Sequence, residues 1–343
     1  MQIDLMEYRL QLKHTFRISR DCGRDFVDVA IVRIHHLGFT GYGEASPSKY
    51  WGEDIESVKA AFSELNFYKY PELSDYEGII KNINSTDNPP RSLLAAIEMA
   101  ILDCVSKSRG QSVRQLLGIP SDRNVRSSFT IGIADLNTIE LKVQEAAKFP
   151  ILKVKLGADN DIQIIEKIRS QTNKTIRVDA NEGWTKEEAV KKINWLENQN
   201  VEFVEQPLPA SQNENMAWVK ARVNLPLFAD ESVKNSSDIP ALVNFFDGIN
   251  IKLMKCGGIL EALSMIQSAK QSGMKVMAGC MTESSLAISA GAQFLPLLDF
   301  ADLDGFELIS NDPFTGLTMT DGYISINNNL GLGVSPKNEL YSD

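Results

Sequence analysis

ILKVKLG (151–157) and TIRVDAN (175–181) are two of eight short apolar runs that follow one another after residue 125. The other six read FTIGI (129–133), VEFVEQP (201–207), LPLFADES (225–232), GINIKL (248–253), KVMAGCM (275–281) and FADLDGF (300–306). A polar or reactive side chain lies in or near the end of each run, at Thr130, Lys155, Asp179, Glu205, Asp230, Lys252, Cys280 and Asp302. The steps between these positions are 25, 24, 26, 25, 22, 28 and 22 residues, and each step can hold one strand, one helix and two short loops. Eight buried parallel strands predict a TIM-type barrel, whose active site lies at the C-terminal strand ends.

An open, doubly wound α/β sheet is the alternative to a closed barrel. Such a sheet usually binds its ligand through a glycine-rich loop after a strand, and neither GxGxxG nor GxxxxGK[ST] occurs in this chain. Eight units of regular length also fit a closed barrel better than an open sheet. The predicted fold class is therefore α/β, with a (β/α) barrel at its centre.

The sequence outside the barrel does not follow the strand–helix alternation. Residues 1–124 include a β-branched run, VDVAIVRIH (27–35), and a long helical pattern of apolar residues over 91–108. Residues 306–343 contain the short strand GYISI and a glycine-rich tail. We expect 1–124 and 306–343 to form an α+β capping domain around a catalytic barrel at 125–305.

Composition excludes several classes of protein. The net charge of −10 argues against a nucleic-acid or anionic-membrane partner. The four cysteines form no CxxC pair, so neither a zinc site nor a disulfide framework is indicated. No segment approaches 18 consecutive apolar residues, and the N-terminus lacks the apolar core of a signal peptide. A cytoplasmic protein is the simplest interpretation.

Three consecutive runs end in single acids: Asp179 in VDAN, Glu205 in VEQP and Asp230 in ADES. In a barrel they converge on one sector of the mouth. Three carboxylates without thiols or imidazoles are hard oxygen ligands, which suit Mg²⁺. One such acid would more often be a helix cap or a solvated loop residue, but three at successive strand ends favour a metal site.

Lysines end two further runs. Lys155 and Lys252 belong to the second and sixth strands, which lie across a barrel from each other, on either side of the acids. Lys153 points to the same side of its strand as Lys155 and is expected to support it. Crowding by a second lysine and by Mg²⁺ would lower the pKa of the base. The alternative is a lysine that is salt-bridged to a neighbouring acid, and Lys255 is a weaker candidate that we expect in a loop.

This layout indicates a type of reaction. Removing a proton beside a carboxylate creates an enolate-like dianion, which needs concentrated positive charge, and a bound Mg²⁺ supplies it. One lysine removes the proton from one face of the carbon, and the opposed lysine returns a proton to the other face. The residues therefore predict an isomerase that transfers a proton at a single carbon.

The same motifs resemble those of the muconate-lactonizing subgroup of the enolase superfamily, and within it the dipeptide epimerases. The resemblance covers the whole chain. It rests on the KxK motif at 153–155, the three acids, the segment NIKLMKCGG (250–258) and the helix RSLLAAIEMAILDCVSKSRGQSVRQLLG (91–118). It implies a capping domain on a barrel, a Mg²⁺ cofactor and a catalytic lysine at Lys252 rather than Lys255.

The eighth strand end bears on the substrate, because subgroup members also include lactonizing cycloisomerases, o-succinylbenzoate synthases and N-succinyl amino acid racemases. The resemblance implies that Asp302 and Asp304, in the sequence DLD, hold the α-ammonium of a dipeptide. Two carboxylates on one strand face suit an amine and would repel a succinyl or muconate carboxylate. The alternative is that one of the two caps the following helix.

The loop FRISRDCGRDF (16–26) offers an arginine for the substrate side chain. In the Ala-Glu members of the family an arginine of this loop binds the glutamate carboxylate, which implies Arg24 here and leaves Arg20 as the alternative. Thr130 and Met281 are expected to line the same pocket. The expected substrate is L-Ala-D/L-Glu, a dipeptide of murein metabolism, epimerised at the α-carbon of its C-terminal residue.

Two other hypotheses remain. One is another subgroup reaction, such as N-succinyl amino acid racemisation or o-succinylbenzoate synthesis. The other is a non-enzymatic binding protein on a relic barrel, which the complete set of acids and lysines argues against. A homo-oligomer is expected, with a small dipeptide as the partner.

Overall fold

The eight-stranded barrel predicted from the apolar runs is confirmed. A computed structural model describes residues 1–343 of the chain except 71, 86–88, 122, 327–329 and 342–343. The large sheet is parallel, and its strands lie in the order β11-β10-β9-β8-β7-β6-β5-β4. In chain order these strands are β4 (Phe129–Ile131), β5 (Ile151–Lys155), β6 (Thr175–Asp179), β7 (Val201–Glu205), β8 (Leu227–Ala229), β9 (Gly248–Ile251), β10 (Lys275–Gly279) and β11 (Phe300–Asp302).

The two edge strands of this sheet meet and close the barrel. Ser127, just before β4, forms a parallel bridge with Ala301 of β11. Inside the barrel the rings of Phe203 and Phe228 stack with their centroids 4.3 Å apart, beside the ring of Phe300. This part of the interior is a packed core rather than a pore, which leaves the mouth at the C-terminal strand ends for a site.

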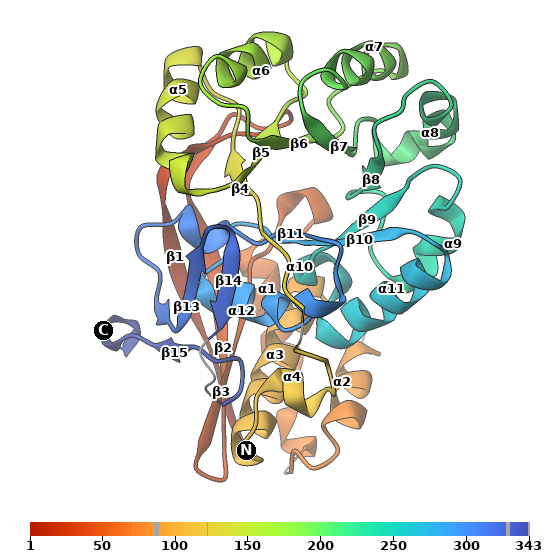
Figure 1. Cartoon of the computed structure of the whole chain (residues 1–343). Helices are drawn as coiled ribbons and strands as arrows, with labels where there is room; N and C mark the ends of the chain where they lie inside the picture. The colour runs from red at the N-terminus through yellow and green to blue at the C-terminus, as the bar shows by residue number, and fades with distance from the viewer. Residues whose placement is uncertain (71, 86–88, 122, 327–329, 342–343) are drawn as a thin grey trace.

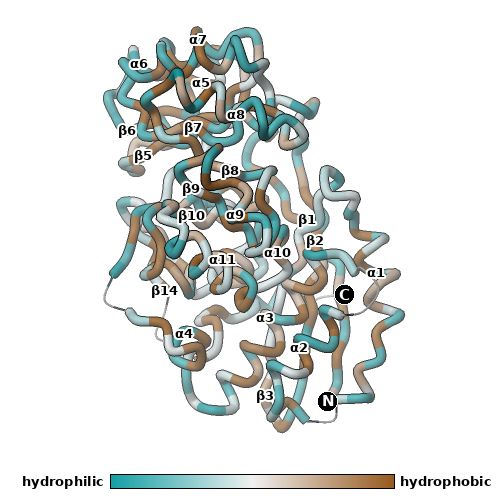
Figure 2. The backbone as a smooth tube through the Cα atoms, turned by 90° about the vertical axis from the view of Figure 1, so that its right-hand side faces the viewer, coloured by the Kyte–Doolittle hydropathy of each residue, from teal (hydrophilic) through white to brown (hydrophobic). Residues whose placement is uncertain are grey.

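Helices alternate with the barrel strands and cover the outside of the sheet (Figure 1). In α7, for example, Thr185 and Glu188 form a capping box at the start of the helix, and Ala189, Ile193 and Leu196 are buried on its inner face. Apolar segments gather around β8 and β9 in Figure 2. The helices of the barrel are α5 (Leu136–Glu145), α6 (Asp161–Arg169), α7 (Lys186–Leu196), α8 (Asn213–Lys220), α9 (Ile239–Leu242), α10 (Leu253–Cys256), α11 (Ile259–Gln271) and α12 (Ser285–Ala292).

The N-terminal unit is an antiparallel sheet with helices packed against it. Its strands are β1 (Gln2–Phe16), β2 (Arg24–His36) and β3 (Phe39–Ala45), in that order in the sheet. Its helices are α1 (Ile55–Glu64), α2 (Tyr76–Asn84), α3 (Arg91–Ser108) and α4 (Val113–Leu116). The helix expected over 91–108 is therefore present at the same residues. Within the described ranges, no helix is both long enough and apolar enough to cross a membrane.

The C-terminal segment returns to the N-terminal unit. The hydroxyl of Tyr8 on β1 donates to the carbonyl oxygen of Asn311 at 2.9 Å, and the carboxylate of Asp103 on α3 accepts from the backbone N–H of Leu332 at 2.8 Å. The described part of this segment contains short strands. They are β12 (Phe314–Thr315), β13 (Leu317–Thr320), β14 (Tyr323–Ile326) and β15 (Ser335–Pro336).

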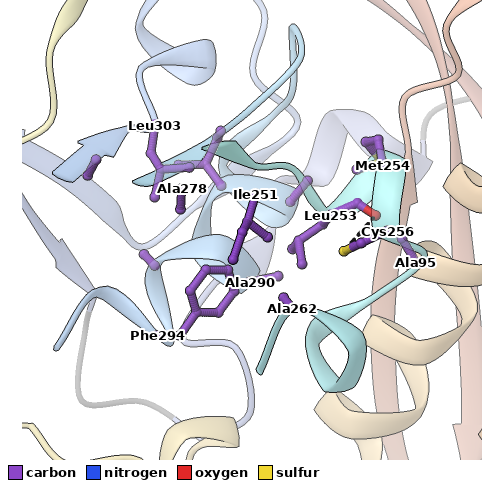
Figure 3. Close-up of a cluster of buried hydrophobic side chains, with 14 of the residues drawn as sticks. Ala95, Ile251, Leu253, Met254, Cys256, Ala262, Ala278, Ala290, Phe294 and Leu303 are labelled. Carbon is purple, nitrogen blue, oxygen red and sulfur yellow. Dashed lines mark hydrogen bonds between the residues drawn. The ribbon is translucent and has the colours of Figure 1, made fainter. Parts of the chain in front are cut away.

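The capping domain contacts the barrel through the short helix α10, which follows the sixth barrel strand. Figure 3 shows Leu253 and Met254 of α10 in one buried cluster with Ala95 of α3 and Ile251 of β9. The four side chains are almost completely excluded from solvent. The end of β9, which carries Lys252, is therefore held in place by apolar contacts that reach into the capping domain.

The contact between β3 and α3 leaves no room for a side chain at Gly43. A Cβ atom there would lie 1.8 Å from the carbonyl oxygen of Ala96. We predict that Gly43→Ala lowers the free energy of unfolding by about 3 kcal/mol, at the upper end of the usual cost of overpacking, when measured by urea denaturation.

Gly52→Ala is the matched control for this substitution. Gly52 has a φ of 75° and open space around its Cα, so an alanine there meets only the cost of a left-handed backbone, about 1 kcal/mol. An equal loss of stability in the two variants would contradict the steric argument.

Candidate active site and metal centre

Three carboxylates meet at the mouth of the barrel. Asp179 ends β6, Glu205 ends β7 and Asp230 directly follows β8. Parallel pairing of β6 with β7 sets Asp179 beside Glu205. One oxygen of each acid lies within 4.8 Å of the others, and all three side chains are buried. The fold thus brings the three acids predicted as metal ligands together.

The backbone turns sharply after two of these acids. Asn181 and Gln206 have φ angles of 42° and 37°, which are uncommon for residues other than glycine. The N–H of Asn181 donates to Oδ1 of Asp179 at 2.9 Å, and Oε1 of Gln206 accepts from the N–H of Asp230 at 3.0 Å. The two turns therefore supply hydrogen bonds to two of the predicted metal ligands. Backbone strain of this kind is often found at functional sites.

Lys155 and Lys252 approach the acids from opposite sides. Their strands, β5 and β9, stand four places apart in the order of eight, so they lie on opposite walls of the barrel. Nζ of Lys155 donates to Asp179 at 2.6 Å, and Nζ of Lys252 donates to Asp230 at 2.7 Å. The two predicted bases therefore flank the three carboxylates.

Lys153 is surrounded by acids. Its side chain is 1% exposed, and Nζ lies 2.6 Å from Asp302, 2.8 Å from Glu205 and 3.3 Å from Asp179. Burial on its own would lower the pKa of Lys153, but the three carboxylates outweigh burial and raise the pKa well above its usual value. Lys153 therefore remains a cation, which suits a supporting role rather than that of a base.

The pKa of Lys252 differs from the sequence expectation. Burial lowers it, as expected of a crowded lysine, but the combined attraction of Asp230, Glu205 and Asp179 outweighs burial, and the net shift is upward. The expected decrease in the pKa of Lys252 took account of a second lysine and a cation, but of no neighbouring acid. Lys252 is therefore salt-bridged to Asp230 in this structure, as the alternative interpretation had it. A cation bound at Asp230 would weaken the attraction between Asp230 and Lys252.

Glu205 has the least compensated charge of the three acids. Burial, followed by the neighbouring Asp179, raises the pKa of Glu205 to about 7, whereas Lys155 and Lys153 overcome burial and hold the pKa of Asp179 at about 2. Oε2 of Glu205 forms no hydrogen bond with any described residue, although it makes a salt bridge with Nζ of Lys153 at 2.8 Å. A buried carboxylate oxygen that forms no hydrogen bond and whose charge is poorly compensated fits a hard cation such as Mg²⁺.

Two further residues of this site were missed or misplaced by sequence reasoning. Lys255, expected in a loop, lies buried in α10, and its Nζ donates to Oδ1 of Asp230 at 2.5 Å. Nδ2 of Asn250 donates to Oε1 of Glu205 at 2.7 Å. The sequence indicated Asn250 only as a polar residue within the apolar run GINIKL, and it did not indicate that Glu205 would be its partner.

The acids of the eighth strand have unequal partners. Asp302 accepts from the hydroxyl of Ser128 at 2.7 Å and from Nζ of Lys153 at 2.6 Å. Asp304 accepts from the N–H and the hydroxyl of Thr130, at 2.6 and 3.1 Å. Burial, followed by the charge of Asp302, raises the pKa of Asp304 to about 7. Asp304 thus has hydrogen-bond donors but no salt bridge within the described part of the chain.

Thr130 and Met281 lie beside this pair of acids. Thr130, on β4, donates both its N–H and its hydroxyl to the carboxylate of Asp304. Met281 follows β10, is partly buried, and donates its N–H to the carboxylate of Glu283 at 2.7 Å. Both residues lie near the C-terminal end of a strand that adjoins β11.

Arg20 reaches the mouth of the barrel and Arg24 does not. Nη1 of Arg20 lies 2.6 Å from Oε1 of Glu231, which follows Asp230, and its guanidinium stacks over the ring of Tyr50 at 4.2 Å. Arg24 begins β2, is largely exposed, and lies 3.7 Å from Asp21. The role expected of Arg24 stays a prediction, and of the two arginines the loop between β1 and β2 turns Arg20, the alternative, toward the barrel.

The chain matches proteins with the same arrangement of domains. Residues 139–340 match the family described as Enolase C-terminal domain-like. An L-Ala-D/L-Glu epimerase of Bacteroides thetaiotaomicron is 42% identical over 336 residues, which span 97% of this chain and 88% of that protein.

Two solved structures share the whole fold. A substrate-liganded L-Ala-D/L-Glu epimerase from Bacillus subtilis has a TM-score of 0.92 and 29% identity, and the match covers 98% of each chain. A dipeptide epimerase from Cytophaga hutchinsonii, complexed with Mg and D-Ala-L-Val, has a TM-score of 0.91 and 27% identity, with 98% of this chain and 96% of that chain covered. Together with the family match over more than half of its length, these likenesses show that this chain belongs to the Enolase C-terminal domain-like family.

Proposed function

We propose that this protein is a Mg²⁺-dependent dipeptide epimerase that moves a proton at the α-carbon of the C-terminal residue, with L-Ala-D/L-Glu as its substrate. The observation that carries the proposal is the pair of lysines, Lys155 and Lys252, on opposite walls of one carboxylate cluster. The relatives that act on dipeptides or bind them support the choice of substrate class.

The three acids at the mouth fit the cofactor. Asp179, Glu205 and Asp230 present carboxylate oxygens within one small space, and Glu205 retains an oxygen without a hydrogen bond. Mg²⁺ held there supplies positive charge to the substrate carboxylate and so stabilises the negative charge that develops when the α-proton leaves. This need for an external cation also explains why three acids are kept so close together.

The two lysines divide the proton transfer between them. A neutral lysine on one wall takes the α-proton, and the ammonium on the other wall delivers a proton to the opposite face. Each lysine begins hydrogen-bonded to an acid, Lys155 to Asp179 and Lys252 to Asp230, so each is held in position before substrate arrives. The product is the epimer, and the lysines exchange roles for the reverse reaction.

Asp304 is the better placed of the two strand-eight acids to bind the substrate ammonium. Asp302 is already paired with Lys153, whereas Asp304, among the described residues, accepts hydrogen bonds only from the uncharged donors of Thr130. An ammonium brought against Asp304 would supply the missing positive charge. The same acids would repel the succinyl carboxylate of an N-succinyl amino acid.

The substrate side chain is assigned to the capping domain. Arg20 stands over the mouth beside Tyr50, and its partner Glu231 can be exchanged for the carboxylate of a glutamyl residue. We also propose a cytoplasmic, homo-oligomeric enzyme. The four free cysteines are consistent with a reducing compartment.

We predict that the wild-type protein with Mg²⁺ incorporates deuterium from D₂O into L-Ala-L-Glu faster than into L-Ala-L-Phe, L-Ala-L-Lys or N-succinyl amino acids, as measured by mass spectrometry. Arg20→Met should reduce labelling of the glutamyl dipeptide about tenfold or more, because a charged hydrogen-bond partner is lost. Arg24→Met is the matched control and should leave labelling unchanged. Preferential labelling of N-succinyl amino acids would contradict the epimerase assignment.

Lys155→Ala tests the division of labour between the lysines. We expect epimerisation to fall by at least about a thousandfold, within the range of effects seen for catalytic groups. The variant should still exchange the α-proton of one epimer with solvent deuterium, because Lys252 is intact on the other wall. NMR of each epimer in D₂O measures this, and loss of exchange from both epimers in a folded variant would refute separate-face bases.

The KM for the dipeptide should depend on pH through Asp304. The pKa of this acid is raised to about 7, so it is mostly neutral at pH 6 and mostly ionised at pH 8, and only the ionised form attracts an ammonium strongly. We predict that KM falls by up to about tenfold between pH 6 and pH 8. Asp304→Asn should raise KM and flatten this dependence, and an unchanged slope in the variant would show that another group titrates.

A further inference from the structure

The sixth barrel strand and the short helix after it carry two buried polar residues to which the proton transfer assigns no task. Asn250 lies on β9, two residues before Lys252, and Lys255 lies on α10, three residues after it. Their side chains are 0% and 2% exposed. Each contacts one of the proposed metal ligands.

Asn250 holds Glu205. Its Nδ2 donates to Oε1 of Glu205 at 2.7 Å, while its Oδ1 has no hydrogen-bond partner among the described residues. The neighbouring strand leaves space for this amide only because residue 279 is glycine: a Cβ at Gly279 would lie 2.6 Å from Oδ1 and 2.7 Å from Nδ2. The amide is therefore confined between β10 and the carboxylate that it orients.

Lys255 holds Asp230. Its Nζ donates to Oδ1 of Asp230 at 2.5 Å, to the carbonyl oxygen of Asp230 at 2.6 Å and to the carbonyl oxygen of Asn250 at 3.1 Å. Three acceptors match the three N–H groups of an ammonium. Lys252, by contrast, donates to Asp230 alone in the described structure. Lys255 is therefore fully engaged, whereas Lys252 keeps N–H groups for other partners.

These contacts form one continuous chain from Glu205 through Asn250 and Lys255 to Asp230. The base of the chain is rigid, because Leu253 and Met254 of α10 are buried against the capping domain (Figure 3). We propose that Asn250 and Lys255 are positioning residues that set the orientation of two of the three metal ligands before the cation binds. The proposal rests on the proposed function only in taking Mg²⁺ as the cation.

Stability alone does not account for Asn250. A fully buried amide oxygen without a hydrogen bond is unfavourable, and a leucine of similar volume would fill the same space without an unpaired polar atom. Groups that orient metal ligands, in contrast, are typically worth a factor of about 10 to 100 in metal affinity. Ligand orientation is therefore the better explanation for an asparagine here.

Asn250→Leu is the first test. Isothermal titration calorimetry with MgCl₂, without dipeptide, should show a Kd about 10 to 100 times that of the wild type. The melting temperature without metal should be unchanged or higher. Unchanged Mg²⁺ affinity, or a loss of affinity that accompanies a lower melting temperature, would overturn the proposal for Asn250. Asn250→Ala, read in the same two ways, is the second variant if the leucine is not accommodated.

Lys255→Met gives a test whose sign is decisive. If Lys255 were only a nearby positive charge, its removal would relieve repulsion of the cation and strengthen Mg²⁺ binding. A positioning role predicts weaker binding, by about tenfold or more. Lys270→Met, at an exposed position on α11, is the matched control and should bind Mg²⁺ as the wild type does.

These titrations separate the inference from the proposed function. They need no substrate, so a wild type that binds Mg²⁺ but epimerises no dipeptide would refute the proposed function and leave the inference intact. Tighter Mg²⁺ binding by the Lys255→Met variant would overturn the role of Lys255 whatever the substrate proves to be. A wild type with no Mg²⁺ affinity would overturn both.

Discussion

The mouth of the barrel depends on pairing buried charges of opposite sign. Asp179 faces Lys155, Asp230 faces Lys252 and Lys255, and Lys153 lies among Asp302, Glu205 and Asp179. Unpaired charges at these depths would be strongly destabilising, so the acids and lysines can be present only as a set. Compensation is weakest at Glu205, whose pKa is raised to about 7 by burial and by Asp179 although Lys153 lies 2.8 Å away. That local deficit of positive charge suits the cluster to binding a further cation.

The capping domain is joined to the barrel by hydrogen bonds to two of its buried acids. The buried carboxylate of Glu98 on α3 accepts from the N–H of Leu260 at 2.9 Å, and Glu44 on β3 accepts from the N–H of Ser284 at 3.0 Å. Glu98 and Glu44 thus supply acceptors at the N-termini of α11 and α12, where backbone N–H groups have no partner within the helix. This docking carries Arg20 and Tyr50 over the mouth. The barrel therefore provides the chemical groups, and the capping domain contributes side chains above them.

The sequence predicted the regular part of this arrangement well. Strand periodicity and the recurrence of polar strand ends were enough to infer the barrel, the three acids at its mouth and the opposed lysines, because parallel strands all end on the same side of a barrel. The same argument could not rank Arg20 above Arg24, since a loop has no periodicity from which the direction of a side chain follows. It also misplaced Lys255, because a single helical turn begins immediately after Lys252 and rotates the side chain back toward Asp230.

By itself, the sequence determined the (β/α) barrel with its α+β cap and which residue types line the mouth, since these follow from short-range patterns of apolar and charged residues. Only the tertiary structure decided which of those residues pair: Lys153 donates to Asp302, Asn250 to Glu205 and Lys255 to Asp230. It also decided the protonation tendencies, raising the pKa of Lys252 where crowding alone would lower it. The physical reason is that pairing and burial are properties of neighbours in space, and those neighbours come from strands that are far apart in the chain.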